Sequence, residues 1–327
     1  MLLTIIRLPN MPKASSPVLI ILAFFSIYVI WGSTYLLNKI AVAELAPFML
    51  ASIRFLSAGV IIFLLSLLSG KSLRITRKQF FNTVIAGILF LTLGNGVVVW
   101  ALKYIDSGFA ALVISAQPLM VLLFMRIFEG KKIKPMSMVG VVLGIIGIYL
   151  LVSQNEISGG ENSALGIGLI FLALCCWAYG SLFVAKADLP SNYFVNTGYQ
   201  MFFAGIFLCL ISLSFGEKWS APTSWEPWTL YSMLLLIFLG SIVAFTSFNY
   251  LLKIVSPEKV ATSTYVNPVI ALLLGWYFLE EQLTLQSIIA AAVLLTGVYF
   301  INTKKKLVML SRFTNRIRAR DEENTSL

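Results

Sequence analysis

The sequence contains no histidine and only three cysteines, Cys175, Cys176 and Cys209, in 327 residues. Histidine is the commonest metal ligand and acid–base side chain. The cysteines all fall inside apolar stretches, without the spacing of a metal site or a disulfide framework. A phosphate-binding loop is also missing, because the Gly-Lys pair at 70–71 has Leu65 where the motif needs glycine. We therefore predict no metal, no cofactor, no ATP-driven step and no enzymatic activity.

Charged residues are scarce as well, at 12% of the chain, whereas 59% is hydrophobic. A soluble domain of this length needs far more charge to cover its surface. Apolar runs of about 20 residues recur instead, each long enough to cross roughly 30 Å of hydrocarbon as a helix. They lie near 18–38, 47–69, 80–102, 108–128, 136–152, 164–185, 192–215, 230–252, 259–279 and 285–302. The first run is too long for a signal peptide, so the sequence predicts an all-α membrane protein with ten transmembrane helices.

The basic residues are unevenly distributed along the chain. The net charge is +10, and Lys and Arg gather in alternate loops, at 70–79 and 129–135, and in the tail at 303–327. The loops at 153–163 and 280–284 carry only acidic charge. This is the positive-inside asymmetry of a membrane protein and argues against nucleic-acid binding. We expect a multi-pass protein of the cell (inner) membrane, in contact with the lipid bilayer, with both termini cytoplasmic.

Two halves of the chain resemble each other. "SAQPLMVLLFMRIFEGKKI" at 115–133 aligns with "YVNPVIALLLGWYFLEEQL" at 265–283, an offset of 268 − 118 = 150 residues. "WGSTYLLNKIAVAELAPFMLASIRFLSAG" at 31–59 aligns with "WAYGSLFVAKADLPSNYFVNTGYQMFFAG" at 177–205, an offset of 177 − 31 = 146. Each half holds five helices, an odd number, so the second half must be inverted in the membrane. Such repeats are typical of secondary transporters; a duplicated bundle without transport is the alternative.

These alignments divide the chain into five segments. We expect a leader at 1–17, a first repeat at 18–152, an external linker at 153–163, a second repeat at 164–302 and a basic tail at 303–327. Within the first repeat, Gly140, Gly144 and Gly147 form a stripe that permits close approach of another helix. The stripe predicts either an intramolecular contact or the seam of a homodimer.

The repeated segments also resemble a known family. "WGSTYLLNK", "RFLSAG" at 54–59 and "NPVIALLLGWYFLEEQLT" followed by "AAAVLLTGVYFI" are similar to the ten-helix EamA-type members of the drug/metabolite transporter superfamily. The resemblance covers about 18–302 and implies export of amino acids, related metabolites or amphipathic compounds. One position departs from the pattern: family members often have a Gly-Glu pair after the fourth helix, where this chain has Gly130–Lys131.

The two matching prolines, Pro118 and Pro268, each follow an amide, Gln117 and Asn267. A proline inside a helix removes one hydrogen bond and displaces a carbonyl, which in a membrane must face protein or water. Breaks at the same depth of both repeats are typical of a substrate cavity. A kink that only improves helix packing is the alternative.

Further candidates for the cavity lie at the middle of the predicted helices. They are aromatic or neutral and polar: Trp31, Tyr35, Asn95, Trp177 and Tyr265. Such a lining suits an amphipathic or zwitterionic metabolite better than a bare ion. Arg54 adds a positive charge inside the second helix, either as partner of a substrate carboxylate or as an arginine that reaches the interface or a carbonyl.

The sequence therefore predicts a secondary transporter, an exporter by resemblance, that moves a small-molecule substrate by alternating access around a central cavity. A channel or facilitator for small neutral solutes is the alternative.

Overall fold

The computed structural model describes residues 17–130, 132–133, 135–153, 162–255, 260 and 263–302. All regular secondary structure in these residues is helical. Seven continuous helical segments are long and apolar enough to cross a membrane, and three shorter apolar helices lie at Pro135–Leu150, Val266–Leu279 and Leu285–Phe300. The prediction of an all-α membrane protein is confirmed. The leader, the basic tail and most of the linker at 153–163 lie outside the described residues.

The helical segments follow the ten predicted spans in order. Spans one to five are α1 (Pro17–Phe25), η1 (Ser26–Ile30) and α2 (Trp31–Glu44); α3 (Pro47–Leu68); α4 (Arg77–Gly87), η2 (Ile88–Gly96) and α5 (Val97–Ala101); α6 (Ser107–Ile114) and α7 (Gln117–Glu129); and α8 (Pro135–Val152). Spans six to ten are α10 (Ser163–Val184); α11 (Tyr193–Ser214); α12 (Pro227–Leu235), η4 (Leu236–Val243) and α13 (Ala244–Ile254); α15 (Ser263–Leu279); and α16 (Leu285–Asn302). A short 3₁₀ turn, η3 (Pro222–Ser224), lies before span eight.

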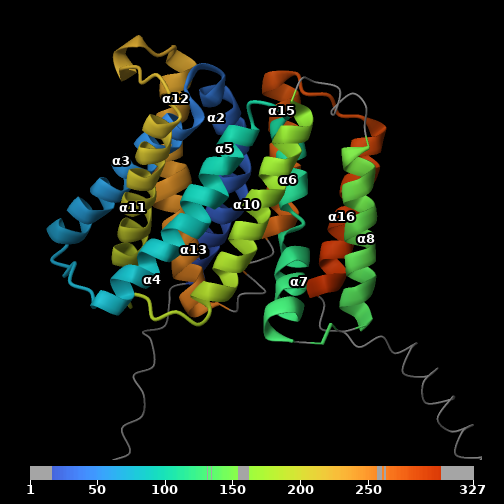
Figure 1. Cartoon of the computed structure of the whole chain (residues 1–327), viewed down its shortest axis with the longest axis horizontal. Helices are drawn as coiled ribbons and strands as arrows, with labels where there is room; N and C mark the ends of the chain where they lie inside the picture. The colour runs from blue at the N-terminus through green and yellow to red at the C-terminus, as the bar shows by residue number, and fades with distance from the viewer. Residues whose placement is uncertain are drawn as a thin grey trace, which may run out of the picture.

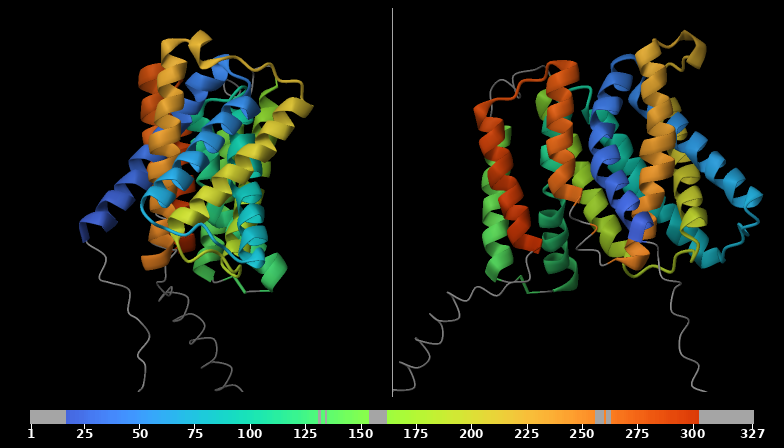
Figure 2. Two further views of the ribbon diagram at one scale, coloured as in Figure 1. Left: turned by 90° about the vertical axis from the view of Figure 1, so that its left-hand side faces the viewer. Right: turned by 180° about the vertical axis from the view of Figure 1, so that it is seen from behind.

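The bundle has two faces, which we name by where the chain ends. Helix α1 begins and α16 ends on one side, at the bottom of Figure 1 and of both views in Figure 2. This terminal face also carries the connection from α7 to α8, whereas the connection from α15 to α16 lies on the opposite face. These two connections are repeat mates in the sequence. Their placement at opposite ends shows that the second half is inverted relative to the first.

In the part of the chain that the structure describes, three spans contain π-helical segments, a rare geometry that often marks functional sites. Two of these segments, η2 and η4, are themselves repeat mates, since 236 − 88 = 148 lies between the offsets of 146 and 150 that the sequence shows. The third, η1, interrupts span one immediately before Trp31. The repeat therefore extends from the sequence to the local backbone.

The two matching prolines have different effects on their helices. Span four is interrupted at Ser115 and Ala116, and Pro118 lies in the first turn of α7, where a missing N–H costs nothing. Span nine, by contrast, continues through Pro268. One side of the side-chain amide of Asn267 faces only backbone carbonyls, so its nitrogen is assigned to that side; in this orientation it donates to the carbonyl of Ser263 at 3.2 Å and supplies a local donor beside the proline. The structure thus shows an interruption at Pro118 only.

Glycines hold the outermost pair of helices together. Helices α8 and α16 stand side by side at the right of Figure 1, and a Cβ on Gly147 would lie 2.8 Å from the backbone nitrogen of Leu294. Its repeat mate Gly297 sits equally close to the carbonyl of Gly140 and the nitrogen of Gly144. The stripe predicted from the sequence therefore makes an intramolecular contact; a homodimer stays a prediction that this stripe does not support.

Replacing Gly147 with alanine should destabilise the protein by about 1–3 kcal/mol, because the added methyl group meets backbone atoms that cannot rotate away. Gly168→Ala is the matched control, since a Cβ there meets open space within 4 Å. Thermal denaturation in detergent measures both. Equal midpoints for the two variants would contradict the proposed close contact.

Candidate functional site

Arg54 lies in the middle of the bundle, on α3. Its side chain is buried, with 3% of its surface exposed, so it reaches neither lipid nor the interface. Its Nε donates to the hydroxyl of Ser241 at 2.8 Å, and its Nη1 makes long contacts with Oδ1 of Asn38 at 3.4 Å and of Asn95 at 3.5 Å. All three acceptors are neutral oxygens.

The π-helical repeat mates bring two of these acceptors to Arg54 from the two halves of the protein. Asn95 belongs to η2 in the first repeat and Ser241 to η4 in the second, and their separation of 241 − 95 = 146 equals one of the sequence offsets. Asn38 comes from α2 and also donates to the carbonyl of Thr34 at 2.8 Å. Arg54 therefore lies on the seam between the repeats.

The charge of Arg54 has no negative partner within the described part of the chain. No ion pair is made by its guanidinium there, and its Nη2 makes no hydrogen bond to those residues. A guanidinium offers five N–H donors, and its best partner is a carboxylate held by two parallel bonds. An unpaired charge at the bilayer centre costs about 2.5–3.5 kcal/mol by insertion measurements. The site is therefore suited to an anionic group.

Aromatic side chains form a wall next to the charge. Trp31 donates from Nε1 to the carbonyl of Gly240 at 3.3 Å, and a Cβ on Gly240 would lie 3.3 Å from Nη2 of Arg54. The ring of Trp31 meets Trp177 edge to face, with centroids 6.3 Å apart, and packs against Phe248 at 5.1 Å. The positive charge and an apolar surface thus adjoin each other.

A second polar cluster joins spans three, seven and eight. Gln200, the repeat mate of Arg54, is buried and donates to Oδ1 of Asn196 at 3.2 Å, while its own Oε1 has no partner among the described residues. Asn249 donates to the hydroxyl of Thr197 at 2.8 Å, and Thr83 contacts Asn196 at 3.5 Å. The two repeats therefore differ at corresponding positions: one holds a cation, and the other holds a neutral amide.

The structure brings only part of the predicted cavity together. Trp31, Trp177, Arg54 and Asn95 form one connected group through the contacts above. Tyr35 is half-buried and packs against the core that contains Val42 and Leu45.

The two proline-linked amides and Tyr265 lie elsewhere. Gln117 opens α7, and its neighbour Ala116 packs with Leu174 and Leu294 rather than with Arg54. In the amide orientation assigned above, the nitrogen of Asn267 donates to the carbonyls of Ile27 and Tyr28 in η1, both at 2.9 Å, one turn before Trp31. Tyr265 belongs to α15, but its side chain is outside the described residues. The roles of these residues as substrate ligands stay predictions.

Sequence reasoning missed Ser241 and Gly240. Ser241 could have been found from its offset of 146 residues from Asn95, because the repeat places both at corresponding positions of the third helix of each half. Gly240 has no such signal, since its role depends on the close approach of Trp31 and Arg54.

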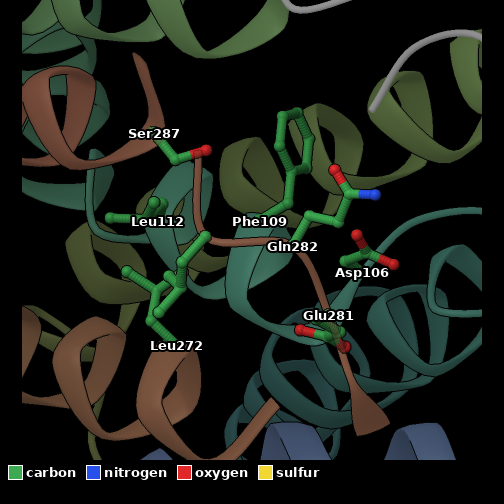
Figure 3. A pocket seen from close by; sticks show the side chains of 8 residues that line it. Asp106, Phe109, Leu112, Leu272, Glu281, Gln282 and Ser287 are labelled. Atoms are coloured by element: carbon green, nitrogen blue, oxygen red, sulfur yellow. The ribbon is translucent and has the colours of Figure 1, made fainter. Parts of the chain in front are cut away.

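A small pocket lies at the opposite face, and neither Arg54 nor its bonded partners line it (Figure 3). It is lined by Asp106, Phe109, Leu112, Leu272, Glu281, Gln282, Leu283 and Ser287 and encloses about 10 Å³, room for about one water molecule. Burial, and then the charge of Glu281, raise the pKa of Asp106, while Lys39 opposes this rise. The pocket is too small for a metabolite, and the acidic pair at its rim belongs to the contact between repeats.

Comparison with known proteins identifies the family of the chain. The family model of the EamA-like transporter family matches the chain twice, at residues 18–153 and 164–303. The chain belongs to the EamA-like transporter family. It is therefore a membrane transporter of the drug/metabolite transporter superfamily, as the resemblance in its sequence predicted.

The relatives of this EamA-like transporter are also named as transporters. It is 35% identical over 286 residues to the uncharacterized inner membrane transporter YedA of Escherichia coli, which covers 87% of this chain and 91% of that protein. It is 27% identical over 300 residues to the uncharacterized transporter YvbV of Bacillus subtilis, covering 91% and 94%. A crystal structure at 19% identity superimposes with a TM-score of 0.62 over 92% of this chain and 99% of the other, which shows the same fold. The transporter is a multi-pass protein of the inner membrane.

Replacing Asn267 with alanine should lower thermal stability by about 1–3 kcal/mol, because the carbonyls of Ile27 and Tyr28 then lose a donor inside the bundle. Gln282→Ala, an exposed amide on the opposite face, should leave stability unchanged. Denaturation midpoints in detergent check both. An Asn267→Ala protein as stable as the parent would contradict the helix–helix role of this amide.

Proposed function

We propose that this protein is a secondary transporter that exports small organic metabolites carrying a carboxylate, such as amino acids, by alternating access around Arg54. The single observation that carries the proposal is the buried guanidinium without a counter-ion in the described residues, on the seam of two inverted repeats. A substrate carboxylate would neutralise this charge and take up donors that these residues leave free.

The neighbouring aromatic side chains support the zwitterionic part of the proposal. Trp31 donates to the carbonyl of Gly240, the residue that lies against Nη2 of Arg54, and Trp177 packs against Trp31. An amino acid bound by its carboxylate at Arg54 would place its ammonium group or an apolar side chain against these rings, which attract both. A bare inorganic anion would gain nothing from this wall.

Alternating access is supported by where Arg54 lies. The guanidinium is held by one residue from η2 and one from η4, so the relative movement of the two repeats changes the site itself. Because Arg54 is buried from both faces, cargo can reach it only after one face opens. Inverted halves that rock around a midplane site are the common solution to this requirement.

The charges of the two faces support a cytoplasmic terminal face. Near that face the described residues carry an excess of basic side chains: Lys71, Arg74, Arg77, Lys78, Arg126, Lys132 and Lys186, against Glu129 and Asp188. The opposite face carries Glu44, Asp106, Glu217, Glu226, Glu280 and Glu281, against Lys39, Lys103 and Lys218. Positive-inside asymmetry then orients both chain ends toward the cytoplasm. The direction of transport rests on the family resemblance alone.

Purified protein in liposomes tests the proposal against the channel alternative. Vesicles loaded with unlabelled L-amino acids should accumulate the matching radiolabelled amino acid transiently, by counterflow, with saturable kinetics. A channel gives neither counterflow nor saturation. Linear, non-saturating flux for every amino acid tested would overturn the transporter mechanism.

Asn95→Asp should place a carboxylate beside Arg54 and mimic the substrate. We expect a higher denaturation midpoint, by about 2–4 °C per kcal/mol gained, together with at least about tenfold weaker counterflow because the site is already neutralised. Gln200→Glu is the matched control: its bonded neighbour, Asn196, is neutral, so a buried carboxylate there should lower the midpoint. Equal shifts in the two variants would contradict an uncompensated charge at Arg54.

A further inference from the structure

Helix α3 of the first repeat is capped by a residue of the second repeat. The backbone N–H groups of Phe48 and Met49 donate to the two carboxylate oxygens of Glu217, at 3.2 and 2.8 Å. The residue in the capping position of α3 itself is Ala46, whose methyl side chain cannot accept them. Ser212 also donates to Glu217, at 2.6 Å, and fixes the carboxylate. A carboxylate at a helix N-terminus is favoured by both the free N–H groups and the helix dipole.

Helix α6 is capped in the same way. The N–H groups of Ser107 and Gly108 donate to the carboxylate of Glu281, at 2.8 and 3.0 Å, while Asp106 in the capping position makes no such bond. Gly275 makes room for this contact, because a Cβ there would collide with the Glu281 carboxylate. In Figure 3 Glu281 and Asp106 lie together at one end of the pocket that Leu112 and Leu272 also line.

A third contact joins the same face less tightly. The N–H of Glu226, just before α12 of the second repeat, lies 3.2 Å from both oxygens of Glu44, a residue of the first repeat. Glu44 and Glu226 are both exposed, so water competes for this bond. All three contacts cross between the repeats on the opposite face.

The terminal face is built differently. There α11, the repeat mate of α3 (193 − 47 = 146), is capped by its own Asn192, which accepts from Phe194 at 3.0 Å. Helix α4 has its own capping box formed by Thr76 and Gln79. The position that matches Glu281, at 281 − 150 = 131, is a lysine, which cannot cap a helix N-terminus.

Among the described residues, the repeats meet on the terminal face through side-chain contacts and not through helix caps. The hydroxyl of Tyr199 donates to the carbonyl of Leu73 at 3.1 Å in a partly buried, uncharged bond. Lys186 pairs with Glu129 at 2.6 Å, but the lysine side chain is 71% exposed. Gln79 donates to Asp188 at 3.2 Å, also at the surface. Such contacts are screened by water and salt and contribute little. The two faces are therefore closed by bonds of different strength.

We propose that Glu217 and Glu281 form the gate of the opposite face. Each must release a helix N-terminus of the other repeat before that face can open, whereas the described residues of the terminal face are joined by exposed side-chain contacts and the uncharged bond of Tyr199 to Leu73. The transporter accordingly rests closed on the opposite face and admits cargo first from the terminal face. This inference rests on the alternating access proposed above, but its test needs no substrate.

Accessibility of the pocket beneath Glu281 measures the gate directly. In a background in which Cys175, Cys176 and Cys209 are replaced by alanine, Ser287→Cys places a buried thiol in that pocket. Right-side-out vesicles are treated with a membrane-impermeant maleimide, and the labelling rate is followed. Glu281→Gln and Glu217→Gln should each raise the rate about tenfold, because a charge-assisted bond pair is weakened while the side-chain shape is kept.

Variants at neighbouring residues show whether the increase in labelling is specific to the capping carboxylates. Glu280 is adjacent to Glu281, has the same charge and is exposed, so Glu280→Gln should label at the parental rate. Gly275→Ala keeps the carboxylate but displaces it and should raise the rate as Glu281→Gln does, which supplies an answer even if one glutamine variant does not fold. Unchanged labelling in the folded Glu217, Glu281 and Gly275 variants, or an equal rise in Glu280→Gln, overturns the gate. Increased labelling in a protein that shows no counterflow would instead overturn only the proposed transport.

Discussion

Arg54 carries its charge into the middle of the bundle, where it meets the neutral oxygens of Ser241, Asn38 and Asn95. A lone charge at this depth is expensive, so the surrounding structure must hold it in place. The π-helical segments η2 and η4 supply Asn95 and Ser241, two of the residues that contact the guanidinium. The wider turn of a π-helix moves these side chains out of the register of an ordinary helix. The aromatic residues around Trp31 then close the site from the side. The family membership shows a transporter, and the buried charge is the basis on which we propose an organic anion or zwitterion as its substrate.

The two repeats are similar in backbone and different in chemistry. Arg54 corresponds to Gln200, so this buried charge has no counterpart at the matching position of the second repeat. Helix α3 is capped across the seam by Glu217, whereas its mate α11 caps itself. Duplication gives a protein two interchangeable halves; these differences make one face and one half of the site distinct.

The sequence predicted the architecture well because that architecture depends on composition and period. Runs of apolar residues and an offset of 146 to 150 residues determine ten spans and their inversion. The glycine stripe of α8 was also visible, although only the structure identified α16 as its partner. What could not be predicted depends on side-chain direction. The π-helical turns have no recognisable sequence pattern, and they decide that Asn95 and Ser241 meet Arg54.

The two proline-centred segments illustrate the same limit. Gln117–Pro118 and Asn267–Pro268 look equivalent in sequence, but only span four is interrupted, and Asn267 bonds to the carbonyls of η1. An irregular turn in span one, invisible in the sequence, provides those acceptors. Of the predicted cavity residues, Arg54, Asn95, Trp31 and Trp177 lie together. Their residue types alone suggest this, because a cation and the N–H groups of tryptophan need partners within the protein when they are buried in a membrane.

The central claim is that Arg54 binds the carboxylate of the substrate. Stabilisation of the protein by added ligand tests this claim most directly. Denaturation midpoints of the purified protein can be compared for each L-amino acid and its carboxamide, which differ only in the charge of that group. The account predicts that at least one amino acid raises the midpoint, that its carboxamide does not, and that Arg54→Gln abolishes the difference. Equal stabilisation by acid and amide, or an effect that persists in Arg54→Gln, would contradict it.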